Sequence, residues 1–283
     1  MYKQKLCLGT AQQFGISIEE QIRLFKKTGF EAFFTMWDGR LKEYKKIADD
    51  LGMIYQSVHA PYLNAAAMWQ SSAASERAVE ELLVCVEDCA DINVPILVVH
   101  PYIGFEECYQ PNREGIENFR RVIEAAKLRN VNIAFENVEG QAYLDALMNE
   151  FYDHENVGFC WDSGHEQCYN KGKDMLRLYG SKLIATHLND NLGISDNGGK
   201  IFWTDDLHLL PFDGINNWED IAERLIQCGY NGILTFELLK QSKPNRHDND
   251  KYSRMPVEEY IAECYARACR VAALVARGCK YDK

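Results

Sequence analysis

The chain has 283 residues, of which 47% are hydrophobic and 26% charged. This composition is typical of a folded globular protein and excludes a disordered or fibrous chain. With 42 acidic and 31 basic residues, the formal net charge is −11. The charge disfavours nucleic acid and anionic membranes as partners, although a local basic groove would still permit nucleic acid, and it suits a small-molecule partner better.

The sequence also bears on location and redox state. No segment approaches the roughly 18 consecutive apolar residues that cross a bilayer, and the opening residues MYKQKLCLGT lead into a strand-like segment without a secretory signal. The ten cysteines are scattered and form no CxxC pair, a pattern that favours reduced, buried thiols over disulfides. We therefore expect a cytoplasmic protein without a membrane partner.

Apolar segments rich in Val, Ile, Phe and Leu alternate along the chain with helical patterns. The predicted strands cover residues 5–9, 32–36, 55–59, 96–100, 132–136, 158–162, 183–187 and 233–237. The predicted helices cover residues 18–28, 41–51, 75–92, 115–129, 142–150, 174–178, 218–228 and 257–276. Eight strand-helix units predict an α/β fold, a (β/α)8 TIM barrel, with residues 1–283 as a single domain. An open doubly wound sheet usually has fewer strands and often a GxGxxG turn, which this sequence lacks.

Six of the eight predicted strands end in a potential metal ligand, at positions where an apolar strand would ordinarily run into turn residues. These ligands are His59, His100, Glu136, Asp162, His187 and Glu237. Closing the sheet into a barrel brings the carboxyl ends of all strands around one axis, so these side chains are expected to converge. Three further candidates are His165, which follows Asp162 by three residues, and the pair Asp206 and His208 in the long segment 189–217.

The residue types indicate which ion such a site would hold. A mixture of Glu, Asp and His favours a divalent cation of hard or borderline character, such as Zn, Mn, Mg or Co. No cysteine occupies a strand end, which argues against a structural thiolate zinc site. Carboxylates packed this closely would repel one another without a cation. The interpretation is therefore a catalytic metal site, although any one of these residues alone could be a polar residue of the barrel rim.

The motifs SVHAPY, LVVHPY, FENVEG, WDSGH, THLND and TFELL resemble those of the xylose isomerase-like TIM-barrel superfamily. This superfamily contains sugar isomerases and epimerases and the endonuclease IV family of DNA-repair enzymes, and the resemblance covers essentially the whole chain. In the ketose epimerases a single divalent metal is held by Glu, Asp, His and Glu from strands five to eight, which match Glu136, Asp162, His187 and Glu237. The resemblance implies a metal-dependent isomerase or epimerase acting on a sugar or sugar phosphate.

Endonuclease IV is the alternative that the same resemblance offers. Its three-zinc cluster uses those four ligands and further ones, which match His59, His100, His165, Asp206 and His208. In that case His59 and His100 would share one zinc with Glu136, and the last three would hold another. Three departures, together with the net charge, favour the isomerase: the Asp-x-His pair reads DLH where that family has DRH, the sixth strand continues as WDSGHEQCYN where that family has a DTCH-type sequence, and the second strand ends in TMWDG without basic residues. A third alternative is a metal-binding or sugar-binding barrel without turnover, which would be expected to lack one of the four core ligands.

The expected chemistry is proton transfer. A divalent ion that chelates a carbonyl oxygen and the neighbouring hydroxyl would acidify the C–H bond between them and stabilise an enediolate. We expect Glu136 and Glu237 to lie on different sides of the barrel mouth and to move this proton. Two carboxylates on opposite faces would give epimerisation, and one carboxylate acting on adjacent carbons would interconvert aldose and ketose.

Substrate contacts are predicted from residues beside the strand ends. Trp37, which directly follows the second strand, and Glu139 are predicted to bind substrate, and His165 would contact either the metal ligands or a substrate hydroxyl. Further candidates for an apolar wall against a sugar face are Trp69, Trp161 and Trp203. The sequence leaves the sugar, its phosphorylation, the metal and the oligomeric state open, with a homo-oligomer among the options.

Overall fold

The computed structural model describes residues 4–105 and 110–278. Eight parallel strands form one sheet in the order β7-β6-β5-β4-β3-β2-β1-β8. The strands are β1 (Leu6–Gly9), β2 (Ala32–Met36), β3 (Ile54–His59), β4 (Ile96–Val99), β5 (Asn132–Glu136), β6 (Val157–Asp162), β7 (Leu183–His187) and β8 (Leu234–Phe236). A parallel bridge between Leu188 and Phe236 brings β7 and β8 together, and Leu188 N donates to Thr235 O at 2.8 Å. The predicted (β/α)8 TIM barrel is thereby confirmed.

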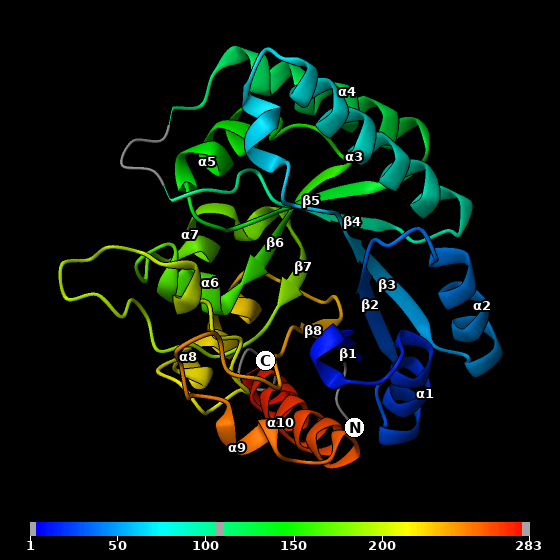
Figure 1. Ribbon diagram of the computed structural model, residues 1–283, viewed down its shortest axis with the longest axis vertical. Coiled ribbons are helices and arrows are strands. Elements are labelled where there is room, and N and C mark those ends of the chain that lie inside the picture. Colours follow the sequence, from blue (N-terminus) through cyan, green and yellow to red (C-terminus); the bar gives the residue numbers. More distant parts are fainter. Residues whose placement is uncertain (1–3, 106–109, 279–283) are drawn as a thin grey trace.

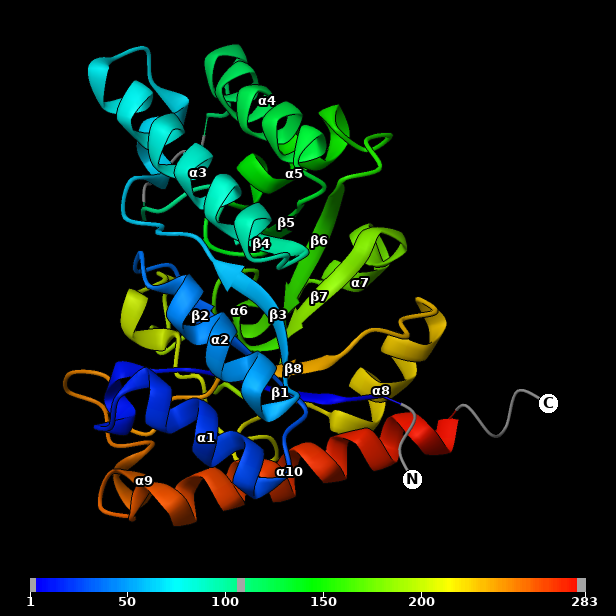
Figure 2. The ribbon, with the colours of Figure 1, turned by 90° about the vertical axis from the view of Figure 1, so that its right-hand side faces the viewer.

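Helices surround the strands on the outside of the barrel (Figure 1). The α-helices are α1 (Ile18–Thr28), α2 (Leu41–Leu51), α3 (Ala73–Asp91), α4 (Arg113–Leu128), α5 (Gln141–Glu150), α6 (Ser163–Cys168), α7 (Met175–Tyr179), α8 (Trp218–Gln227), α9 (Asp250–Ser253) and α10 (Val257–Gly278). Short 3-10 turns cover Gln12–Phe14, Ala65–Trp69, Gly180–Lys182 and Trp203–Asp205. The long helix α10 runs along one side of the barrel beside α1 (Figure 2).

Local sequence signals set the ends of α1. The Ser17 side chain accepts a hydrogen bond from Glu20 N, and the Glu20 carboxylate accepts one from Ser17 N, which together form a capping box. The helix ends at Gly29, whose φ of 125° is a conformation that other residues rarely adopt. Ile22 and Phe25 are buried against the core. Polar caps and an apolar face thus fix where this helix begins, ends and packs.

The alternation of side chains along each strand determines which residues reach the barrel interior. A small buried cluster contains Val98, Ala134, Cys160 and Ala185. Each of these residues lies two positions before a predicted ligand, namely His100, Glu136, Asp162 and His187. Because residues i and i+2 of a strand share a face, the four ligands also point inward, above a layer of small apolar side chains.

The structure adds detail that the sequence patterns did not predict. Strands β4 and β8 end one residue early, so His100 and Glu237 directly follow their strands. Helices α6 and α9 were not predicted, and α6 begins immediately after Asp162. Among the described residues, no helix combines the length and the apolarity needed to cross a membrane. The cysteines of this part of the chain are free thiols, as expected, and Cys108 and Cys279 lie outside the described residues.

Candidate active site

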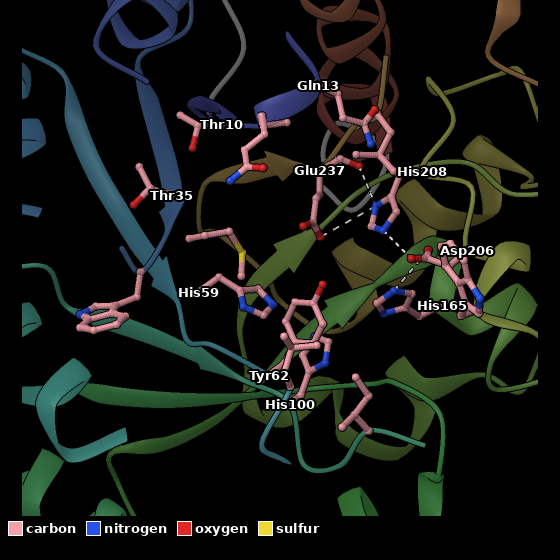
Figure 3. A pocket seen from close by; sticks show the side chains of 18 of the residues that line it. Thr10, Gln13, Thr35, His59, Tyr62, His100, His165, Asp206, His208 and Glu237 are labelled. Atoms are coloured by element: carbon pink, nitrogen blue, oxygen red, sulfur yellow. Dashed lines mark hydrogen bonds and ion pairs between the residues drawn. The ribbon is translucent and has the colours of Figure 1, made fainter. Parts of the chain in front are cut away.

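The nine predicted ligands meet at the carboxyl ends of the strands, and Figure 3 labels six of them: His59, His100, His165, Asp206, His208 and Glu237. Eight of them form three groups, in each of which one donor atom per residue lies within 4.8 Å of the others, and two of the groups share Glu136 and His187. Glu136, Asp162, His187 and Glu237 form one group; His165, Asp206 and His208 form a second; His59, Glu136 and His187 form a third. His100 joins the third group, because its Nε2 lies 3.2 Å from Glu136 Oε2. The predicted convergence is therefore present in the structure.

Glu136 lies at the centre of this cluster and is fully buried. Its Oε2 lies 3.2 Å from His59 Nε2 and 3.2 Å from His100 Nε2, and its Oε1 lies 2.9 Å from His187 Nδ1. Burial by itself would raise the pKa of Glu136, but these three histidines hold that pKa well below its ordinary value. Glu136 is thus an ionised carboxylate with both oxygens directed at potential metal ligands.

Asp162 connects the cluster to the start of α6. Its Oδ1 accepts hydrogen bonds from Gly164 N at 2.8 Å and His165 N at 2.7 Å, and its Oδ2 accepts one from Asn189 Nδ2 at 2.8 Å. It therefore caps the helix, which points His165 toward the site. Burial raises the pKa of Asp162 to about 6, although His165 and His208 act to lower it, so this carboxylate is partly protonated at mildly acidic pH.

Glu237 is the carboxylate of the first group that faces the cavity, and 24% of its side chain is exposed. Its Oε2 lies 3.2 Å from His187 Nδ1 and 3.9 Å from His208 Nδ1. Burial opposes ionisation, but His187 and His208 lower the pKa of Glu237 to about 2. Glu136 ends β5 and Glu237 directly follows β8, so the two residues come from strands that are not neighbours in the barrel. Both side chains reach the barrel axis, and Glu136 lies below the cavity floor with an oxygen within 4.8 Å of one of Glu237.

Asp206 organises the second group. Its Oδ2 accepts a hydrogen bond from His208 Nε2 at 2.9 Å, and its Oδ1 lies 3.4 Å from His165 Nε2. His208 Nδ1 also donates to the carbonyl oxygen of Glu237 at 3.1 Å. Burial alone would lower the pKa of His165 and His208, but Asp206 and the neighbouring carboxylates raise it for both rings. Two imidazoles with raised pKa values thus surround one carboxylate. Metal ligands without their ion commonly bind protons in this way, so the three residues form a potential ligand set.

The loop that delivers Asp206 and His208 is held by a residue that the sequence patterns missed. Asp190 is fully buried, and its carboxylate accepts four hydrogen bonds at 2.9–3.0 Å. The donors are Asn191 N, Phe212 N, Asn216 N and Trp218 Nε1. The Asp190 carboxylate thus fastens both ends of a long irregular segment to the start of α8. The THLND motif contains Asn189 and Asp190 and was the signal available for them.

Above the ligands opens a cavity of about 730 Å³. Of the nine predicted ligands, Glu136, Asp162 and His187 lie beneath it, and the other six line it, as do Trp37 and Glu139. Glu139 accepts a hydrogen bond from Gly104 N at 2.9 Å, and burial raises its pKa. The ring of Tyr62, which was not predicted, stacks on His100 with centroids 4.8 Å apart, and Figure 3 shows it directed into the cavity.

The tryptophans proved to have different roles. Trp37 lines the cavity, and its orientation is fixed by a 2.8 Å hydrogen bond from Nε1 to Asp88 Oδ2. Trp203 also lines the cavity and is 52% exposed. The prediction was wrong for Trp69 and Trp161, which are buried and bond Pro101 O and the Glu166 carboxylate. In β6, Trp161 stands between two inward-facing residues, so strand alternation directs it outward toward the helices.

The first group of residues fits a divalent metal ion. Its three carboxylates and one imidazole each offer a donor atom within 4.8 Å of the others, and His187 Nε2 is buried without a hydrogen-bond partner among the described residues. Oxygen and imidazole donors are the ligands of zinc and of harder divalent ions. Glu136, Asp162, His187 and Glu237 are therefore the residues that would hold the ion.

Fold and site together define a TIM barrel with a candidate metal centre at the carboxyl ends of its strands. A sequence model of the family described as xylose isomerase-like TIM barrel matches residues 20–255. Because this match spans most of the chain, the protein belongs to the xylose isomerase-like TIM barrel family.

Two curated proteins are similar in sequence to this chain. The y4fM protein of Sinorhizobium fredii is 34% identical over 171 residues, which cover 56% of this chain and 52% of that protein. An inosose isomerase of Halalkalibacterium halodurans is 24% identical over 255 residues, covering 83% of this chain and 88% of the relative. The chain thus matches about half the length of the first relative and most of the second.

Solved structures with the same fold include the IOLI protein with a zinc atom, with a TM-score of 0.74 and 18% identity over 95% of this chain and 98% of that one. An L-ribulose 3-epimerase gives a TM-score of 0.72 and 15% identity, with coverage of 98% and 97%. At these identities the likeness establishes the fold.

Proposed function

We propose that the protein is a divalent-metal-dependent isomerase or epimerase that acts on a sugar or sugar phosphate. The observation that carries the proposal is the convergence of Glu136, Asp162, His187 and Glu237 beneath a large cavity at the mouth of the barrel. Similarity to an inosose isomerase over most of both chains supports this reaction class.

A bound ion would polarise a carbonyl oxygen and a neighbouring hydroxyl oxygen of the substrate, which acidifies the carbon-bound hydrogen between them. Glu237 is the carboxylate placed to accept this proton, because it is ionised and is the carboxylate of the ligand group that lines the cavity. Its neighbours His187 and His208 stabilise the charged form. Proton acceptance by a positioned carboxylate of this kind contributes about 10²–10⁴-fold to a rate.

Glu136 is the second carboxylate proposed for the reaction. Its oxygens face His59, His100 and His187, and it lies below the cavity floor. Transfer by Glu237 alone between adjacent carbons therefore requires the least rearrangement, and it corresponds to aldose–ketose interconversion. Epimerisation would require Glu136 to exchange a proton on the opposite face of the substrate.

One observation favours a second candidate, a multi-metal phosphodiesterase of the endonuclease IV kind. His165, Asp206 and His208 form a separate group with metal-ligand spacing beside the first, and several metal ions close together are suited to phosphodiester hydrolysis. Against it, Lys243 is the one lysine or arginine lining the cavity among the described residues, whereas a duplex substrate requires several phosphate contacts.

The test is to incubate the metal-loaded protein in deuterated water with a panel of ketoses, inososes and their phosphates, and separately with a duplex containing an abasic site. Mass spectrometry should detect solvent deuterium at a carbon next to a carbonyl in one member of the panel. Strand incision without deuterium in any sugar would overturn the proposal in favour of the phosphodiesterase.

A further inference from the structure

The charged side chains around the cavity bear on the substrate, given the proposed isomerase or epimerase function. Four carboxylates line the cavity, those of Asp38, Glu139, Asp206 and Glu237. Two more, those of Glu136 and Asp162, lie directly beneath. Lys243 is the one lysine or arginine among the described lining residues. Carboxylates therefore outnumber lysine and arginine side chains around the described part of the cavity.

Lys243 is already engaged by the protein. Its Nζ lies 3.4 Å from Asp206 Oδ2 and 5.6 Å from the centre of the Trp203 ring, and 17% of its side chain is exposed. The next cation along the same loop is paired too, since Arg246 lies 3.3 Å from Asp205 and 3.0 Å from Asp248. A phosphate at the mouth would thus have to draw a cation away from a carboxylate in order to pair with it.

A bound metal ion does not remove the excess of negative charge around the cavity. If one divalent ion binds in the first group, the three carboxylates of Glu136, Asp162 and Glu237 still carry one more negative charge than the ion neutralises. Asp38, Glu139 and Asp206 add three more carboxylates, and Lys243 is the one lysine or arginine among the described lining residues, so the formal charge around the cavity, counted with neutral histidines, stays negative and a dianionic phosphate gains no net attraction.

The uncharged polar groups of the wall suit hydroxyl groups. Thr10, Gln12 and Gln13 line the cavity from the segment after β1, Thr35 from β2, and Tyr62 from the segment after β3. Hydroxyl and amide side chains both donate and accept hydrogen bonds, as sugar hydroxyls do. We propose that the substrate is an uncharged polyhydroxylated carbonyl compound and that the carboxylates around the cavity discriminate against its phosphorylated form.

The experiment compares matched pairs, such as D-fructose with D-fructose 6-phosphate and D-ribulose with D-ribulose 5-phosphate, using metal-loaded protein. The readout is kcat/KM for exchange of solvent deuterium, at about 0.01 M and about 0.15 M salt, where the screening length falls from about 30 Å to about 8 Å. The unphosphorylated sugar should be favoured at least tenfold, and the gap should narrow as salt screens the repulsion.

Asp38→Asn removes one lining charge, since Asp38 borders the cavity and bonds only local groups, Arg40 N and Tyr44. It should increase kcat/KM for the phosphate at least twofold relative to the sugar. The matched control Asp153→Asn changes an exposed carboxylate before β6, at the opposite end of the barrel, and should leave the ratio unchanged. Preference for the phosphate, weakening with salt, would overturn this inference alone. Absence of exchange with both members of every pair would overturn the proposed function and this inference together.

Discussion

Asp190 offers a sharp test of how the second half of the site is built. Replacing it with alanine removes one buried carboxylate that accepts hydrogen bonds from three backbone N–H groups and from the indole of Trp218. Those bonds tie the segment bearing Asp206 and His208 to the start of α8. The structure therefore predicts that Asp190→Ala lowers stability and also loosens this half of the cluster.

The expected loss of stability follows from the number of hydrogen-bond donors that the Asp190 carboxylate satisfies. Each buried donor left without an acceptor costs about 1–3 kcal/mol, so four donors at the lower end of that range give a loss of about 4 kcal/mol. For a chain of this size, a loss of about 1 kcal/mol lowers the melting temperature by about 2 °C, so a decrease of about 8 °C is expected. Asp190→Asn keeps one acceptor oxygen and should fall between the wild type and the alanine variant.

Circular dichroism during thermal and urea unfolding measures both quantities, with Asp153→Ala as a control for loss of an exposed carboxylate. The control should change stability by less than about 0.5 kcal/mol. A loss below about 1 kcal/mol for Asp190→Ala would mean that the four hydrogen bonds contribute little to stability, and the role assigned to Asp190 would have to be abandoned.

Three further predictions concern the cavity and the metal centre. Glu237→Gln should reduce turnover by about 10²–10⁴-fold with an unchanged circular dichroism spectrum, because the side chain is partly exposed at the mouth; near-normal activity would remove it from the mechanism. The pKa of His187 is raised well above its ordinary value, and that of Asp162 is raised to about 6, so binding of Zn²⁺ must displace protons and should weaken as pH falls through 6. Calorimetry at pH 7 in two buffers of different ionisation enthalpy should show release of about one proton, and zero release would contradict the assignment of His187. Trp37→Ala should lower kcat/KM by about 2–10-fold through loss of an aromatic surface, and unchanged kinetics would place the substrate away from this wall.

The candidate metal ligands could be predicted from the sequence because a closed barrel places the carboxyl ends of all its strands around one axis. An inward-facing residue at the carboxyl end of a strand must lie near the axis, whatever the rest of the chain does. The same alternation that directs Ala134 inward also directs Glu136, two residues later. It equally directs Trp161 outward, so the error at this residue came from considering its position near a strand end without its register.

Other features depend on tertiary contacts that no local pattern encodes. Lys243 faces Asp206 across two loops that are distant in sequence, and irregular loops lack a periodicity from which their course could be inferred. The depth of Glu136 relative to Glu237 depends on the length and packing of side chains at the barrel axis, including three histidines from different strands.

Metal content tests the central claim most directly. Wild-type protein, Asp162→Asn and His208→Gln would be loaded with Zn²⁺ or Mn²⁺, dialysed, and analysed for bound metal per chain by mass spectrometry. The account predicts one tightly held ion per chain, lost in Asp162→Asn and retained in His208→Gln, because the ion is assigned to Glu136, Asp162, His187 and Glu237. Three ions per chain, or one ion lost in His208→Gln and retained in Asp162→Asn, would contradict it.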